Sequence, residues 1–438
     1  MNSLPVGIIG SGFAAATVAE GLSAAGVKYE CLDASESVKQ LWPARSFTDF
    51  SLNRGVFGGL DVWGGGVSKM ELEHHFGHWA PAEWRAVGSE IRRHKLGKLG
   101  ANFSLLEVDP TMLRFQESLI ALGGKKSLHG RIDVGRYSRR AKKALGQIQK
   151  VKIRSIVREG PQDETGWYGV RLDGSGSQDR RFRAIFMCSG PLLNAYLVAL
   201  LTGKVDYAYG DHLTAVSGNI QFARHVFSGS IGATRSQSRG FSTFDFASGK
   251  GGEGGRDELV SLRISSPFAF PGIPRTNSSG GRFGFRKIYN LHWLADSRPS
   301  AGQLIRFSGL GTSRPSVVTV FDFPRTTVDW LQSTAKRVHS SLERMGVNVT
   351  ANNNLERVTE SNWGTQLFAA QHPYGTVPVS DEGEPNTVDR NLRLSRFQNV
   401  FVVGSSAFPD GRLQHPTSLV VALAAIAARA FIHSFDET

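Results

Sequence analysis

Cysteine is scarce in this sequence: the 438 residues include only two. Two cysteines cannot build the disulfide framework of a small secreted protein. Cys31 and Cys188 both fall in apolar, strand-like runs. We interpret them as buried thiols, because a free cysteine packs as a small apolar residue.

Long apolar runs are missing as well. No stretch approaches the roughly 18 consecutive apolar residues of a membrane-spanning helix. The residues from Met1 to Pro5 are too few for a secretory signal, because the first apolar run begins at once. The sequence therefore predicts a cytoplasmic protein.

Acidic residues are outnumbered by basic ones. There are 51 lysines and arginines against 38 aspartates and glutamates, which gives a formal net charge of +13. The basic residues are scattered, and neither a zinc-finger spacing nor an RNA-recognition motif is found. We expect a solvated basic surface and no nucleic acid as a partner. An anionic substrate and a peripheral contact with a membrane stay open as alternatives.

Glycine, in contrast, is abundant, with 50 residues. This favours an α/β protein with many tight turns over a helical bundle. The chain opens with an apolar run that enters the turn Gly10-Ser11-Gly12-Phe13-Ala14-Ala15, and a helix-like run follows. A second strand-like run, Tyr29 to Asp33, ends in a carboxylate. This order is typical of a dinucleotide-binding βαβ unit.

The residues of this turn have distinct roles in such a unit. Gly10 permits the tight turn, Gly12 lets the backbone approach a pyrophosphate, and Ala15 allows helix and strand to pack closely. Free N–H groups at the helix N-terminus favour phosphate. Asp33 lies 21 positions after Gly12, as expected of the acid that binds a ribose. The motif alone does not distinguish FAD from NAD.

A second glycine-rich segment runs from Gly55 to Gly66 and holds six glycines in twelve residues. It cannot be the interior of a stable helix or strand, and it would let the backbone approach a flat ligand. Trp63 could stack on that ligand or fill the core below the loop. His74, His75 and His78 follow, but their spacing fits no recognisable metal site, so no metal is expected.

The strand–turn–helix pattern occurs twice more, once in the middle of the chain and once near its end. A strand-like run ends at Gly190 before the helical run Leu192 to Leu201, and another buried strand spans Asn399 to Gly404. His415 then precedes the long apolar helix Leu419 to Ile432, whose first turn suits Pro416. Ligands bind at the carboxyl ends of strands in open α/β sheets, which places this histidine near a ligand.

The middle of the chain predicts a second domain. Four strand-like runs between Leu259 and Asp322 suggest one antiparallel sheet, and residues 247–257 suggest a flexible glycine-rich loop. An amphipathic helix is predicted over Thr326 to Gly346. Its apolar face would comprise Val328, Leu331, Ala335, Val338 and Leu342. Exposed aromatic side chains are expected at Phe283, Phe285, Tyr289, His292 and Trp293.

We therefore predict an α/β protein of two domains. A Rossmann-like FAD-binding domain, discontinuous in sequence, would comprise residues 1–210 and 371–438. Residues 211–370 would form an α+β substrate domain built on an antiparallel sheet.

Together these motifs resemble the glucose–methanol–choline (GMC) family of FAD-dependent oxidoreductases, in the form of a short bacterial-type member. The likeness covers about half of the chain. Its carriers are the turn Gly10 to Ala15 with Asp33, Gly58-Gly59-x-x-x-Trp63-Gly64, Ala184 to Gly190, Tyr209-Gly210-Asp211-His212, His372-x-x-Gly375-Thr376, Val388-Asp389-x-Asn391-Leu392-Arg393, Asn399 to Val403, Ser406-x-Phe408-Pro409 and His415-Pro416-Thr417. The family usually has an aspartate where this chain has Gly404.

The resemblance implies an enzyme that oxidises an alcohol, a sugar or another polar substrate, to a carbonyl with non-covalently bound FAD. His372 aligns with the base that removes the hydroxyl proton while hydride passes from carbon to flavin N5. His415 aligns with the position that hydrogen-bonds the substrate oxygen. The implied cofactor contacts are Gly10, Gly12, Phe13, Ala14, Ala15, Asp33, Gly58, Gly59, Trp63, Gly64, Ile153, Gly190, Gly404, Ser405, Pro416 and Thr417. The electron acceptor is not specified.

Two other interpretations stay open. One is a flavin amine oxidase or hydroxylase, but these enzymes give no reason for the paired histidines His372 and His415. The other is a non-catalytic flavin- or nucleotide-binding protein whose basic surface serves a membrane or a partner.

Overall fold

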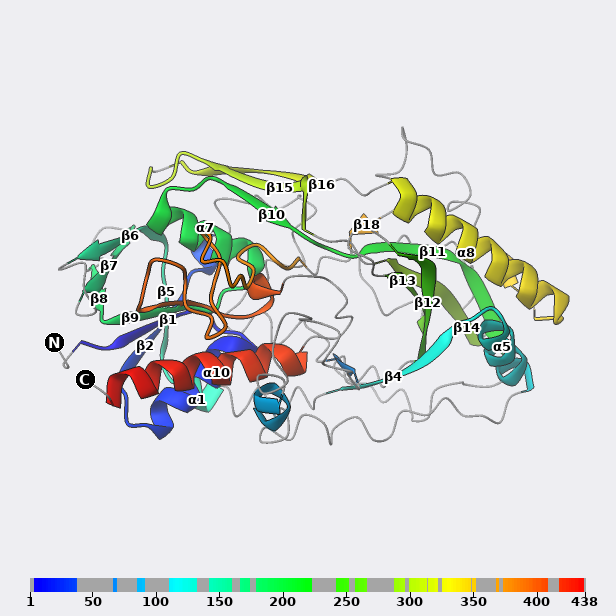
Figure 1. Cartoon of the computed structure of the whole chain (residues 1–438), viewed down its shortest axis with the longest axis horizontal. Coiled ribbons are helices and arrows are strands. Elements are labelled where there is room, and N and C mark those ends of the chain that lie inside the picture. The colour runs from blue at the N-terminus through cyan, green and yellow to red at the C-terminus, as the bar shows by residue number, and fades with distance from the viewer. Residues whose placement is uncertain are drawn as a thin grey trace.

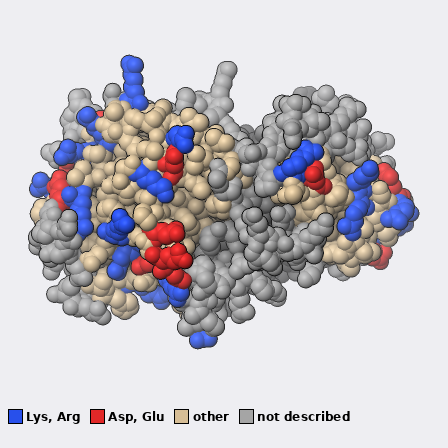
Figure 2. Space-filling model, turned by 45° about the horizontal axis from the view of Figure 1, so that its top comes forward, with Lys and Arg blue, Asp and Glu red and all other residues tan. Residues whose placement is uncertain are grey.

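The computed structural model describes most of the chain. The described residues are 4–37, 66–68, 85–90, 110–131, 142–159, 166–173, 179–222, 242–251, 257–265, 287–295, 299–312, 314–321, 325–347, 349–351, 368–369, 373–408 and 417–436. They form two lobes that lie side by side, each with its own apolar core (Figures 1 and 2). On the face that Figure 2 shows, lysines and arginines are spread over both lobes with acidic residues among them.

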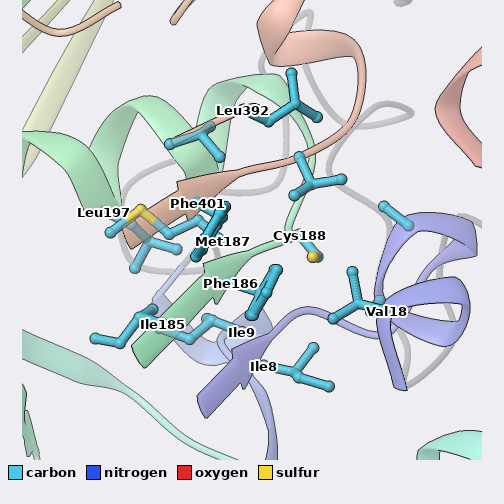
Figure 3. Close-up of a cluster of buried hydrophobic side chains, with 14 of the residues drawn as sticks. Ile8, Ile9, Val18, Ile185, Phe186, Met187, Cys188, Leu197, Leu392 and Phe401 are labelled. Carbon is cyan, nitrogen blue, oxygen red and sulfur yellow. The ribbon is translucent and has the colours of Figure 1, made fainter. Parts of the chain in front are cut away.

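The first lobe is built on a parallel sheet of five short strands. Their order is β19 (Val400–Val402), β9 (Ala184–Met187), β1 (Val6–Ile9), β2 (Tyr29–Asp33) and β5 (Ile148–Lys150). Every residue of β1, β9 and β19 is buried, as expected for a sheet covered on both faces. The rings of Phe186 and Phe401 stack between neighbouring strands with centroids 4.5 Å apart (Figure 3). The predicted Rossmann-like α/β architecture is confirmed.

Helices cover the two faces of this sheet. Helices α1 (Phe13–Ala24) and α10 (Thr417–Asp436) lie on one face and α7 (Pro191–Thr202) on the other (Figure 1). A Cβ atom added at Gly21 of α1 would lie 3.1 Å from the Cβ of Ala428, so α1 and α10 pack closely. The last helix of the chain thus completes a layer begun by the first.

Two small antiparallel sheets complete the first lobe. One consists of β6 (Ile153–Glu159), β7 (Trp167–Leu172) and β8 (Arg180–Phe182). The other consists of β10 (Asp206–Tyr209), β15 (Ser300–Ser308) and β16 (Ser316–Phe321). Phe307 of β15 contacts Tyr196 of α7, with ring centroids 5.6 Å apart. Helix α7 is therefore sandwiched between two sheets, which explains why its sequence is apolar all round.

The second lobe is an eight-stranded sheet covered by two helices. Its strands run in the order β17 (Val349–Ala351), β11 (Leu213–Phe222), β14 (Lys287–Ala295), β13 (Asp257–Ser265), β12 (Ser242–Gly251), β4 (Lys125–Arg131) and β3 (Gly66–Ser68), and β18 (Phe368–Ala369) also pairs with β11. Helices α5 (Pro110–Ala121) and α8 (Arg325–Arg344) lie on the side away from the first lobe (Figure 1). The predicted amphipathic helix is confirmed, because all five residues of its apolar face are buried.

Three details of the prediction for this region are wrong. The four strand-like runs divide between two sheets: β13 and β14 belong to the eight-stranded sheet, and β15 and β16 to the three-stranded one. Residues 247–251 continue strand β12 and are not part of a loop. Trp293 is fully buried against α8 and α5, and His292 is 2% exposed. Burial of the indole is compatible with its polarity because Nε1 donates to Ser217 Oγ at 2.7 Å.

The two cores draw on segments from distant parts of the chain. The first includes Ile305 and Phe307, and the second includes Phe115 and Leu119. The division of the chain at residues 210 and 370 stays a prediction, and each lobe also takes elements from the other side of it. Cys31 and Cys188 are free and buried, as predicted. None of the helices among the described residues is long and apolar enough to cross a membrane.

Candidate active site

The turn after β1 needs glycine at Gly10 for two independent reasons. Its φ of +132° lies in a region that other residues rarely adopt. A Cβ atom there would also lie 2.3 Å from the carbonyl oxygen of Cys188, in the turn that follows β9. The carboxyl ends of β1 and β9 therefore meet here without space for a side chain.

Gly12 differs from Gly10 in both respects. It is the N-cap of α1 with a φ of −90°, and a Cβ atom there would meet nothing within 4 Å. Neither the backbone conformation nor packing against the described residues requires glycine at this position. The remaining reason is the approach of a bound group to the backbone and to the free N–H groups of α1, as the dinucleotide motif predicts. Phe13, Ala14 and Ala15 begin this helix and are buried.

Asp33 ends β2 at the same edge of the sheet. Its side chain is 5% exposed, and its two oxygens accept hydrogen bonds from the N–H and the hydroxyl of Ser35, both at 3.1 Å. Burial raises the pKa of this carboxyl above its usual range, and the bonds from Ser35 and the charge of Lys150 oppose that rise. A ribose hydroxyl that donated to the carboxylate would stabilise its charge further.

Ile153 lies beside this acid. Its N–H donates to Ser37 Oγ at 2.9 Å, and the N–H of Val151 donates to the carbonyl oxygen of Asp33 at 2.9 Å. The chain that leaves β5 is thus held against the end of β2. The structure brings Ile153 and Asp33 to one edge, which is the arrangement that their predicted shared role requires.

The strand order reverses between β1 and β9. From β1 the chain continues through α1 to β2 on one side, whereas β9 lies on the other side and leads into α7 on the opposite face. Ligands of open α/β sheets bind at such a switch point. Gly190, the N-cap of α7, stands there with a φ of +83°, and a Cβ atom at this position would meet nothing within 4 Å.

A buried asparagine that the sequence analysis did not single out connects the turns of this edge. Asn194, in the first turn of α7, is 0% exposed. Its Oδ1 accepts from the N–H of Ser189 at 2.9 Å, and its Nδ2 donates to Val403 O at 3.2 Å and to Ser406 Oγ at 2.7 Å. The available signal was an amide in an otherwise apolar helical run, because a fully buried amide needs hydrogen-bond partners.

Gly404 and Ser405 lie between the two acceptors of Asn194. Gly404 has a φ of +110°, which is strained for any residue with a side chain, so the backbone explains why glycine replaces the aspartate usual in the resembling family. The N–H of Gly375 donates to Ser405 O and that of Val377 to Ser406 O, both at 2.9 Å. The segment that directly follows position 372 is therefore fastened to the end of β19.

The same segment also contacts the passage between the two lobes. Gly210, between β10 and β11, exchanges two backbone hydrogen bonds of 2.9 Å with Tyr374. A Cβ atom at Gly210 would lie 2.3 Å from Cζ of Tyr374, so only glycine allows this contact. The ring of His212 lies 5.8 Å from that of Tyr374. Tyr209 to His212, where the chain enters the second lobe, thus lies beside Tyr374, which follows the predicted base by two residues in sequence.

Thr417 begins α10 with an orphaned hydroxyl. The side chain is 0% exposed, and its Oγ1 has no hydrogen-bond partner among the described residues. A buried hydroxyl without a partner is costly, and here it accompanies the free N–H groups of a 20-residue helix. Together with the cradle at Gly12 and the acid at Asp33, this site fits a large anionic cofactor such as FAD.

Seven predicted site residues lie outside the described residues. They are Gly58, Gly59, Trp63, Gly64, His372, His415 and Pro416. Pro373 and Thr417, which are close to the two histidines in sequence, are described and buried. Within the described part of the chain, no group of three or more His, Cys, Asp or Glu side chains could hold a metal ion.

Comparisons with known proteins concern the family and the fold. Residues 316–424 match the sequence model of the family described as GMC oxidoreductase. A search of curated proteins finds no match. Among solved structures, the crystal structure of pyridoxine 4-oxidase from Mesorbium loti matches with a TM-score of 0.59 and 16% identity, over 98% of this chain and 99% of that chain. At this identity the likeness shows the fold alone.

The matched residues run from β16 to the first half of α10 and include positions 372, 404 and 415. Proteins of this family bind FAD. The predicted resemblance to the GMC oxidoreductases is confirmed, because residues 316–424 match the model of that family and the fold matches that of pyridoxine 4-oxidase.

Proposed function

We propose that this protein oxidises the CH–OH group of a small alcohol to a carbonyl, with FAD bound non-covalently and His372 as the base. The observation that carries the proposal is the fastening of the segment after His372 to the Gly404–Ser406 turn at the carboxyl end of β19. It holds the backbone next to the base against two predicted cofactor contacts. Oxidation of an alcohol also agrees with the name of the structural relative, pyridoxine 4-oxidase.

The residues proposed to hold FAD divide into two groups. Gly10, Gly12 and the start of α1 would hold the pyrophosphate, with Asp33 at the ribose and Ile153 beside it. The other group would surround the opposite end of the cofactor and comprises Gly58, Gly59, Trp63, Gly64, Gly190, Gly404, Ser405, Pro416 and Thr417. Bound FAD would supply the acceptor for the hydride of the alcohol carbon, which carries both electrons of the oxidation.

The two histidines would act on the oxygen of the alcohol. A neutral imidazole at His372 would take the hydroxyl proton, and an ordinary histidine pKa near 6.5 leaves it mostly neutral at pH 7. His415 would donate to or accept from the same oxygen and so orient it. The N–H groups at the start of α10 and the hydroxyl of Thr417 would stabilise negative charge that develops nearby.

The substrate is proposed only as a class, a small polar alcohol with a sugar as the first candidate. The face of the eight-stranded sheet that α5 and α8 leave uncovered carries His292 and Leu294, both buried. A polar and an apolar side chain on one face suit a substrate with both characters. If the substrate is anionic, its apparent affinity will fall steeply with added salt, and a flat response would exclude this variant of the proposal.

The experiment that tests the function is an absorbance spectrum of the purified protein, followed by anaerobic titration with sugars and other alcohols. A flavin spectrum that bleaches with one alcohol is the expected result. A flavin that bleaches with amines and with no alcohol would favour the amine-oxidase interpretation. A protein that takes up no FAD on reconstitution would contradict the proposal.

A further inference from the structure

Asn194 joins three turns that meet at the carboxyl edge of the parallel sheet. Through Ser189 it holds the turn between β9 and α7, and the Ser189 hydroxyl continues the connection to the carbonyl oxygen of Ile9 at 2.7 Å. Through Nδ2 it holds both ends of the turn from Val403 to Ser406. Both amide hydrogens are used, so the side chain has one orientation that satisfies all its partners.

The connections form a closed circuit. From Asn194 it runs through Ser406 to the backbone of Val377, which donates to Ser406 O at 2.9 Å. It returns through Thr376, whose hydroxyl donates to the carbonyl oxygen of Pro191 at 2.9 Å, three residues before Asn194. Asn194, Ser406, Val377 and Thr376 are buried, which strengthens the bonds between them and makes an unpaired member costly.

We infer that Asn194 is a positioning residue that couples occupancy of the cofactor site to the placement of residues 375–377, which closely follow the predicted base in sequence. This inference rests on the proposed function. The Asn194 amide holds both ends of the turn that contains Gly404 and Ser405, two predicted cofactor contacts. It also holds Ser406, whose carbonyl oxygen accepts from Val377. Movement of the Val403–Ser406 turn towards or away from a bound cofactor must therefore move residues 375–377 with it.

Two measurements test this inference. Both start from protein without bound cofactor, to which FAD is then added. The first is the dissociation constant of FAD, measured by flavin fluorescence well below the unfolding temperature of every variant. The second is backbone hydrogen exchange of residues 373–380 with and without saturating FAD. A side chain with a merely structural role would lower the unfolding temperature without changing either quantity.

The variants are Asn194→Leu, which removes all three bonds at similar volume, and Ser406→Ala, which removes only one. Thr202→Val is the matched control, because Thr202 lies at the other end of α7, where its hydroxyl donates to Val198 O at 2.9 Å and accepts from the N–H of Lys204 at 3.3 Å, away from the turns that Asn194 joins. We expect Asn194→Leu to weaken FAD binding at least about tenfold and Ser406→Ala severalfold, with less than a twofold change in the control. FAD should slow exchange of residues 373–380 in the wild type and the control, but not in Asn194→Leu.

Unchanged FAD affinity and unchanged protection in Asn194→Leu would overturn the inference and leave the proposed function standing. If that variant does not fold, Ser406→Ala decides by the same two measurements. A wild-type protein that binds no FAD would overturn the proposed function and the inference together.

Discussion

The five parallel strands of the first lobe are three to five residues long, whereas β11 to β14 of the second lobe have nine or ten. In the first lobe the turns at the strand ends are so crowded that Gly10 tolerates no Cβ atom. In the second lobe the long strands alternate their side chains over a core shared with α5 and α8. In the first lobe the predicted site residues therefore lie mostly in turns at the strand ends. In the second lobe the stabilising contacts are distributed over a broad apolar face of the sheet.

The largest expected effect concerns His372, the predicted base. Replacing His372 by Ala removes the proposed base but no residue of either core. We expect the variant to bind FAD as the wild type does and to reduce its flavin several orders of magnitude more slowly with the substrate alcohol. Stopped-flow absorbance under anaerobic conditions measures this rate. Unchanged reduction kinetics would remove His372 from the mechanism.

The next test separates folding from cofactor binding within the first lobe. Gly10→Ala places a methyl group against the Cys188 carbonyl and requires a strained φ, so we expect a loss of about 3 kcal/mol or more in the free energy of unfolding. Gly12→Ala meets no described atom and should leave the ligand-free protein within about 1 kcal/mol of wild type.

The affinity for FAD should respond to Gly12→Ala, the substitution that we expect to leave the free energy of unfolding nearly unchanged. Gly12→Ala places its methyl group where the pyrophosphate is proposed to lie, so binding should weaken by tenfold or more, on the order of 1.4 kcal/mol. Chemical denaturation and flavin fluorescence measure the two quantities. Equal effects of both substitutions on stability would show that Gly12, too, is structural.

A matched pair of leucines compares the two cores directly. Leu197 of α7 and Leu331 of α8 are both fully buried in helices, one in each lobe. Replacing either by Ala should cost about 2–5 kcal/mol. We expect only Leu197→Ala to weaken FAD binding, because Leu331 belongs to the core without predicted cofactor contacts. A Leu331→Ala variant that loses FAD as readily would show that the two cores act as one unit.

The smallest effect is a pH dependence at Asp33. Its folded-state pKa is raised by burial, so its contribution to stability is complete below the unfolded pKa of about 3.9 and is lost as pH rises through the folded value. Asp33→Asn removes this titration. The variant should therefore gain in free energy of unfolding relative to wild type between about pH 4 and pH 7, while it binds FAD more weakly.

Asp206 provides the control of opposite sign. The hydrogen bond from Arg306 lowers the pKa of this exposed carboxyl, so Asp206→Asn should lose rather than gain stability relative to wild type as pH rises, and by little. Urea denaturation across this pH range measures both differences. A pH-independent difference for Asp33→Asn would show that burial does not disfavour its charge.

The elements that were predicted correctly from the sequence are those whose pattern lies within one short segment. The βαβ unit follows from Gly10 to Asp33, and the apolar face of α8 follows from helical periodicity, because both patterns are local. The division of β13 to β16 between two sheets could not be predicted, since strand periodicity does not identify the pairing partner. Asn194 escaped for a related reason: its partners Val403 and Ser406 are about 210 residues away, and nothing near Asn194 indicates them.

Less is established for the predicted site residues than for the fold. The α/β architecture and the match of residues 316–424 to the GMC oxidoreductase model are established, whereas the roles of His372 and His415 stay predictions, because these histidines lie outside the described residues. Their neighbours Tyr374 and Thr417 have contacts that the sequence could not specify. The contact of Tyr374 with Gly210 depends on backbone geometry and not on any recognisable pattern.

The position of β19 and α10 in the first lobe has a consequence for synthesis on the ribosome. Strands β1, β2 and β9 are synthesised well before β19 and α10. Until residues from 400 onward have been made, β9 therefore lacks its partner strand β19, and α1 lacks its close contact with α10. The second lobe, whose strands and helices all lie before residue 370, can be complete by then. The first lobe is therefore completed after the second, and its apolar sheet edge stays exposed to chaperones, and to aggregation, until β19 has been made.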